Sequence, residues 1–184
     1  SVSKKTVSSN EKRETISSKS FLFVPYWSLL SNEKINDKSD VYIYFGIAAD
    51  TQGIVVSDEG YRKVDNFIKL VSSDKEKVLA VRMVDSEINS NVIKSISSQE
   101  KIINETVRLA NEFNFDGIVL DFEMNAIPFE KVVLRVSEFY KLFFRNAKEA
   151  NLSFYVTIFG DTFYRVRPYD MRALGENSDG IMVM

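Results

Sequence analysis

Apolar residues along this chain fall into short continuous runs that alternate with stretches of helical periodicity. Continuous apolar runs are typical of strands that are buried on both faces of a parallel sheet. They occur at 21–24, 41–47, 78–84, 115–122, 154–159 and 179–184. Strands of this kind, alternating with helices, predict an α/β fold in which a parallel sheet is covered by helices.

Helical periodicity fills most of the intervals between these runs. The predicted helices cover 59–72, 97–114, a long segment from Pro128 and a short segment near 169–174. Ser97 and Glu100 have the spacing of a capping box, which marks a helix start. Residues 50–56 predict a loop or a small hairpin. Alternation of this kind fits a barrel, and it also fits an open doubly wound sheet.

The fourth apolar run ends in two carboxylates. Side chains alternate across a strand, so Val119, Asp121 and Glu123 share one face, while the other face is wholly apolar. In parallel α/β barrels the chemistry lies at the carboxyl ends of the strands. Two acids at that place suit acid catalysis, although their like charges repel. A turn that enters an acidic surface strand would give the same pattern.

Composition narrows the chemistry. The chain has 184 residues, 45% of them hydrophobic, which is enough for one domain with a real core. A net charge of −2 argues against a nucleic-acid partner, and no apolar window is long enough for a membrane span. The chain has neither histidine nor cysteine, so acid–base work falls on carboxylates, tyrosine or lysine. No glycine-rich phosphate loop is present, and we expect no cofactor and no metal.

The acidic run Asp116–Glu123 resembles the DGxDxDxE signature of glycoside hydrolase family 18, the chitinase-like barrels. Further segments look like the same family: 24–27 is similar to the end of its first strand, 42–45 to its second strand and 178–184 to its sixth. The resemblance covers residues 21–184. It implies a (β/α)₈ barrel of the chitinase type, of which this chain holds about strands one to six.

The resemblance also implies a mechanism and a site. Glu123 would be the general acid of a retaining, substrate-assisted glycosidase, and Asp121 would orient the substrate's acetamide group. The implied substrate is a β-1,4-linked N-acetylglucosamine polymer, either chitin-type or peptidoglycan. Tyr26, Asp161 and Met184 are candidate sugar-binding residues, with Met184 at the pocket floor. Trp27 either stacks on a sugar ring or is a rim or core aromatic.

Three departures from the family pattern matter. Val119 stands where many members carry a middle Asp that shares a proton with the next one, so control over Asp121 should be weaker. Many chitinases carry a Ser-x-Gly-Gly sequence at the strand end where this chain has Arg82 and, just after it, Asp85. Either one of these two side chains lines the pocket instead, or both are solvated; for Arg82 we expect solvation. The chain also ends before the expected catalytic Tyr, two residues past Met184.

These departures keep several alternatives open. A barrel of about 250 residues would need a C-terminal part beyond this chain, and we expect the six strands alone to fold poorly or to associate through their edges. A non-catalytic sugar-binding protein of the same fold is the rival to the enzyme, and a structural domain with a decayed site is a third possibility.

Residues 1–20 predict a disordered tether, and we expect an extracellular or cell-surface location.

Overall fold

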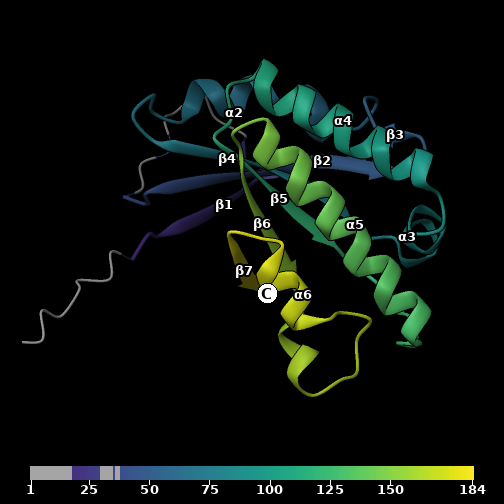
Figure 1. The fold of residues 1–184 in the computed structure, drawn as a ribbon. Coiled ribbons are helices and arrows are strands. Elements are labelled where there is room, and N and C mark those ends of the chain that lie inside the picture. The colour runs from purple at the N-terminus through teal and green to yellow at the C-terminus, as the bar shows by residue number, and fades with distance from the viewer. Residues whose placement is uncertain (1–17, 30–34, 36–37) are drawn as a thin grey trace, which may run out of the picture.

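A computed structural model of the chain describes residues 18–29, 35 and 38–184. Its centre is one sheet of parallel strands (Figure 1). In spatial order the strands are β1 (Phe21–Pro25), β2 (Val41–Asp50), β4 (Glu76–Met83), β5 (Gly117–Phe122), β6 (Ser153–Ile158) and β7 (Gly180–Val183). The short β3 (Gly53–Ile54) returns antiparallel beside the end of β2. Of the two alternatives predicted for 50–56, a loop or a small hairpin, the structure shows the hairpin.

The order of the strands decides between the two architectures that the sequence left open. Apart from β3, strands that are consecutive in the chain are neighbours in the sheet. A doubly wound sheet reverses its strand order at a switch point, whereas a barrel runs in one direction. The doubly wound alternative is therefore wrong, and the fold is a partial barrel with six parallel strands.

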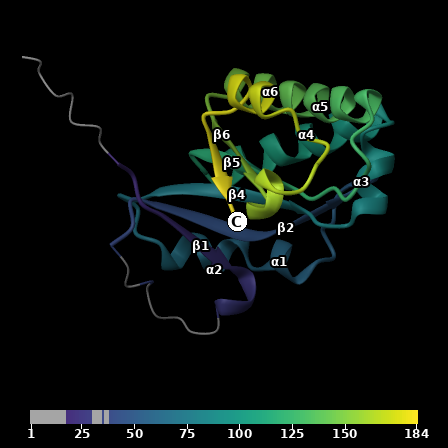
Figure 2. The same cartoon turned by 90° about the horizontal axis from the view of Figure 1, so that it is seen from below.

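Helices follow β2, β4, β5 and β6 along the chain. They are α1 (Glu59–Arg62), α2 (Val64–Leu70), α3 (Ser86–Val92), α4 (Ile96–Glu112), α5 (Glu130–Glu149) and α6 (Met171–Glu176), with 3₁₀ turns η1 (Tyr26–Ser28) and η2 (Gly160–Phe163). In Figure 2, helices α4, α5 and α6 lie above the strands of the sheet, and helices α1 and α2 lie below them. The sheet curls between them, so the helices cover its outer face.

The larger core lies between the outer face of the sheet and the helices. Ile118, Leu120 and Phe122 of β5 are fully buried there. The Phe122 ring lies 5.5 Å from the Phe139 ring of α5, and Phe143 of the same helix stacks on Phe154 at 5.1 Å. These contacts explain the apolar face of the acidic strand, because that face fixes β5 against α5.

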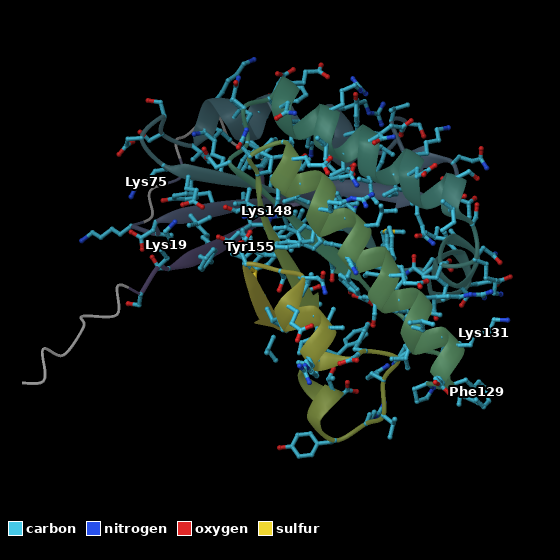
Figure 3. All side chains as sticks on the ribbon, in the orientation of Figure 1. Lys19, Lys75, Phe129, Lys131, Lys148 and Tyr155 are labelled. Atoms are coloured by element: carbon cyan, nitrogen blue, oxygen red, sulfur yellow. The ribbon has the colours of Figure 1, made fainter. Side chains whose placement is uncertain are left out.

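A second, smaller core fills the inner face of the sheet. Its buried members are Val41, Ile43, Val78, Ala80 and Val119. Phe21 of β1 and Tyr155 of β6 (labelled in Figure 3) meet edge-to-face, with ring centroids 5.6 Å apart, although three strands separate β1 from β6. Such a contact requires a strongly curved sheet, so the inner face is a concave barrel interior.

Three local predictions need correction. The single helix expected over 59–72 is two helices, because Lys63 is the C-cap of α1 and the N-cap of α2. Ser95 rather than Ser97 caps α4, since its hydroxyl accepts a hydrogen bond from the Ser98 amide at 3.2 Å. Helix α3 was not predicted at all. The side chain of Asp85 caps it by accepting from two backbone amides.

The predicted tether at 1–20 lies outside the described residues, except for its last three positions. Ser20 donates its hydroxyl hydrogen to Asp40 at 2.7 Å, and Lys19 forms an ion pair with Glu76 at 2.5 Å. These contacts tie the chain to the sheet just before β1. Among the described residues, no helix has the length and apolarity needed to cross a membrane.

Candidate functional site

Asp121 lies at the carboxyl end of β5, on the concave face. It is 1% exposed, and its Oδ1 accepts a hydrogen bond of 2.5 Å from the Thr157 hydroxyl of β6. Its Oδ2 is buried without a hydrogen-bond partner in the described structure. Burial raises the pKa of the Asp121 carboxyl, while the hydrogen bond from Thr157 and the charge of Arg82 oppose this rise. One oxygen of Asp121 is thus anchored, and the other is buried and unpaired in the described structure.

Glu123 follows β5 directly and is only partly buried. Burial raises the pKa of the Glu123 carboxyl, the negative charge of Asp121 raises it further, and Arg167 lowers it. A carboxyl group with a raised pKa remains protonated nearer neutral pH, which a general acid requires. The two carboxyls therefore have different environments: Asp121 is enclosed and anchored, and Glu123 is accessible.

The backbone around Glu123 is held from three directions. Its amide donates to the Met83 carbonyl at 2.8 Å, which continues the pairing of β4 with β5. The buried Asn89 of α3 donates through Nδ2 to the Glu123 carbonyl at 2.6 Å. The Tyr169 hydroxyl donates to the Phe122 carbonyl at 2.9 Å, and burial raises the pKa of Tyr169 to about 12, so this donor stays protonated. The proposed acid thus stands on a rigid support.

Arg82 of β4 lies beside Asp121 in the sheet, because the two are register partners. Its side chain is 15% exposed, so the expectation that it is solvated is wrong. The guanidinium lies over the Tyr26 and Phe45 rings, at 5.2 and 5.6 Å from their centroids, and 3.5 Å from an oxygen of Asp58. The Arg82 guanidinium thus packs against two aromatic rings, and its positive charge favours the ionised form of Asp121.

Neither Asp121 nor Glu123 lines either of two cavities in the described structure. One of about 300 Å³ lies between the loop after β5 and the loop before α6, lined by Asn125, Pro128, Arg165 and Arg167 among others. A larger groove of about 680 Å³ runs along α5 to Asn177, near the amino ends of the strands and away from Asp121. No cluster of three or more acidic side chains fit to hold a metal occurs in the described ranges.

No protein-family model and no curated protein matches this sequence. Solved structures do match. A class V chitinase variant from Nicotiana tobaccum in complex with NAG4 gives a TM-score of 0.75 at 15% identity, over 90% of this chain and 51% of that one. YKL-39, solved with chitooligosaccharides, gives 0.71 at 14%, over 91% and 50%. The chain folds as part of a chitinase-type barrel. The fold that the acidic motif predicted is confirmed.

A bacterial enzyme has a similar fold as well. The spore cortex-lytic enzyme SleL of Bacillus cereus gives a TM-score of 0.70 at 16% identity, over 90% of this chain and 40% of that one. The chain thus spans about half, or less, of the length of these chitinase-type structures. Identities this low establish the fold, and the chemistry of the chain has to be argued from its own residues.

The other predicted sugar-binding residues lie at the same end of the chitinase-type barrel as the carboxylates. Trp27 is 52% exposed after β1, and its ring meets the Tyr26 ring edge-to-face at 5.1 Å. Met184 follows β7 and is 50% exposed; its carbonyl accepts from the Gly160 amide at 2.7 Å. Asp161, in η2, pairs with Arg167 at 2.6 Å. Their roles in binding remain predictions.

Val119 lies one layer below Asp121, in the apolar interior of the barrel. It is fully buried and pairs in register with Ala80 and Tyr155. A carboxylate here would be buried with no cation in the surrounding apolar layer. We therefore expect Val119→Asp to destabilise the protein by about 3 kcal/mol or more, rather than to restore the family pattern without cost.

Denaturant unfolding of Val119→Asp measures this cost. The exposed Val84, which lies just beyond β4, provides a matched control, and Val84→Asp should leave the midpoint almost unchanged. A Val119→Asp protein as stable as the wild type would show that this layer already tolerates a charge.

Three residues that support the site were not predicted from the sequence. Asn89 belongs to the helix that was missed, and only the Asp85 cap in front of Ser86 could have indicated it. Tyr169 and Arg167 come from the loop before α6. No local pattern connects that loop to the strand end at 121–123, because the contacts span more than forty residues.

Proposed function

We propose that this chain carries the acid–base centre of a retaining, substrate-assisted glycosidase that cleaves β-1,4-linked N-acetylglucosamine-containing glycans. The observation that carries the proposal is the pair at the end of β5. One carboxyl, on Asp121, is enclosed and anchored to Thr157 with one oxygen free. The other, on Glu123, is accessible and has a raised pKa.

The mechanism assigns each carboxyl one role. Glu123 protonates the glycosidic oxygen as its bond to C1 breaks, while the carbonyl oxygen of the substrate's own N-acetyl group bonds to C1 and forms an oxazolinium ion. The carboxylate of Asp121 accepts a hydrogen bond from the acetamide N–H through its free oxygen and offsets the positive charge. Glu123, now ionised, takes a proton from the water that opens the ring and retains the configuration.

Electrostatics support this division of labour. The acid step needs Glu123 protonated, and the negative charge of Asp121 favours that state. The same step needs Asp121 ionised, and Arg82 and Thr157 favour the charged form against burial. Burial raises the pKa of both carboxyls, so the charged role of Asp121 is assigned from its hydrogen bond with Thr157 and its neighbour Arg82, which oppose that rise.

A non-catalytic sugar-binding protein of the same fold is the second candidate, and Val119 favours it. The apolar residue below Asp121 removes the middle acid of the family motif, so no proton can be passed from Asp121 to the layer beneath it. The exposed ring of Trp27 would serve a lectin as well as an enzyme. In either case the expected ligand is the same glycan, and we propose an extracellular or cell-surface location because such polymers lie there.

Hydrolysis of fluorogenic N-acetylglucosamine oligomers tests the proposal, measured on the longest natural form of the protein that contains this chain. Release of the fluorophore with retained anomeric configuration is the expected result. Binding of the same oligomers without hydrolysis would make the protein a lectin. Neither binding nor hydrolysis, on chitin-type or peptidoglycan fragments, would refute both candidates.

A further inference from the structure

The cavity of about 300 Å³ lies next to the proposed proton donor. Asn125, which lines it, is two residues beyond Glu123, and its amide donates to the Ser86 hydroxyl oxygen at 2.9 Å. Arg167, which also lines the cavity, donates a hydrogen bond to the Asn125 side chain and is near enough to Glu123 to lower the pKa of that carboxyl. A substituent on the sugar held at Glu123 would therefore reach this cavity.

Arg167 is fixed in place before any ligand arrives. Its side chain is 11% exposed, and it donates through Nη2 to Asp161 Oδ2 at 2.6 Å and through Nε to Oδ1 at 3.2 Å. Its Nη1 donates to Asn125, and its guanidinium lies 4.5 Å from the centroid of the Phe159 ring. This arginine therefore joins the loop before α6 to the loop that follows Glu123.

Arg165 is arranged differently. Its side chain is 74% exposed, and its one ion pair in the described structure is a loose contact of 3.5 Å from Nε to Asp161 Oδ2. Two guanidinium groups thus share the single carboxylate of Asp161. With Glu123 protonated for the acid step, the cavity carries an uncompensated positive charge, and most of the Arg165 side chain is exposed to solvent.

The remaining walls are apolar. Ile127 and Val166 line the cavity and are 67% and 80% exposed. A guanidinium beside apolar side chains suits a ligand that carries a carboxylate next to a small hydrocarbon group, because arginine binds carboxylates in a two-pronged geometry. A chitin chain is neutral and has no carboxylate for these arginines to bind. A sugar with a lactyl ether, as in muramic acid, offers both a carboxylate and a methyl group.

We propose that Arg165 and Arg167 form a subsite for the lactyl carboxylate of a muramic acid unit, so that the preferred substrate is peptidoglycan glycan rather than chitin. This inference rests on the proposed glycosidase function and specifies its substrate. Arg165 makes the direct contact with the carboxylate. Arg167 holds the subsite at a fixed position beside Glu123.

The test compares Arg165→Gln with wild type in the longest natural form of the protein, on three glycans of equal length. These are peptidoglycan strands, the same strands with their carboxyls reduced to alcohols, and chito-oligosaccharides. We expect Arg165→Gln to lower kcat/KM on peptidoglycan by about 10-fold or more, since a charged hydrogen bond is lost. The other two substrates should be unaffected. Arg172→Gln is the matched control, because Arg172 is exposed on α6 and pairs only with Glu176 in the described structure.

Several results would overturn the subsite. One is an equal loss on all three glycans, and another is a wild-type preference for the reduced strands. Equal cleavage of a glycan in which N-acetylglucosamine alternates with a uronic acid would contradict the assignment to muramic acid. Cleavage of chito-oligosaccharides alone would leave the glycosidase standing and remove the subsite. If no glycan is cleaved, the proposed glycosidase function is wrong. In that case the subsite is tested by binding, and equal affinities of the protein for native and carboxyl-reduced peptidoglycan strands would show that the subsite is wrong too.

Discussion

Glu123→Gln should abolish hydrolysis and leave glycan binding intact. The amide has nearly the same shape as the carboxyl group but cannot donate a proton to the leaving oxygen. General acid–base catalysis contributes about 10²–10⁴-fold to a rate, and here one group serves in both steps, so kcat should fall by at least this factor. The measurement is the initial rate on fluorogenic N-acetylglucosamine oligomers, together with calorimetric binding of an unlabelled oligomer.

The structure offers a matched control for this experiment. Glu100 lies exposed in the second turn of α4, and Glu100→Gln should leave kcat unchanged. Because the Glu123 backbone is held by Met83 and Asn89 and its side chain is partly exposed, Glu123→Gln should also unfold at the wild-type temperature. A Glu123→Gln protein that keeps most of its activity would remove Glu123 from the mechanism and favour another donor.

The parallel sheet was predictable from the sequence because each strand is a nearly continuous apolar run between polar segments. The sequence of β5 also predicts the different surroundings of its two faces, since side chains alternate across a strand and place Asp121 on one face and Phe122 on the other. Helix ends were less predictable. Ser95 and Ser97 are equally good caps by residue type, and only the geometry of the backbone entering α4 selects Ser95.

The candidate site was predictable only where its residues lie on one strand. Asp121 and Glu123 are two residues apart, so local geometry brings them together. Arg82 comes from a neighbouring strand, and a charged residue near a strand end is more often solvated than buried. Its burial depends on Tyr26 and Phe45, whose rings come from two other segments. Such a contact follows from tertiary packing, which a single strand pattern does not contain.

Asp121→Asn should lose activity by about 100-fold or more, because the amide cannot offset the oxazolinium charge. The same variant should be more stable than the wild type at neutral pH. Asp121 is 1% exposed and has one oxygen without a partner, so its charged form is costly to bury. Removing the charge should therefore stabilise the fold by about 0.5–2 kcal/mol, as is common when a functional residue under strain is replaced.

The pH dependence separates this electrostatic cost from a change in packing. Burial raises the pKa of Asp121 above its ordinary value of 3.8, so the unfolded chain releases its proton at a lower pH than the folded one. The wild type then loses stability as the pH rises from about 4 through the raised pKa of the folded protein. Below that window Asp121 is protonated in both the folded and the unfolded chain, and the stability advantage of Asp121→Asn should vanish.

Thermal unfolding at pH 3 and pH 8 measures the difference. For a chain of this size, 1 kcal/mol corresponds to about 2–4 °C in Tm, so Asp121→Asn should unfold a few degrees above wild type at pH 8 and level with it at pH 3. Asp65→Asn, at an exposed carboxylate of α2, should shift Tm little at either pH. An Asp121→Asn protein that is less stable than the wild type only at pH 8 would mean that Arg82 and Thr157 gain more from the carboxylate than its burial costs.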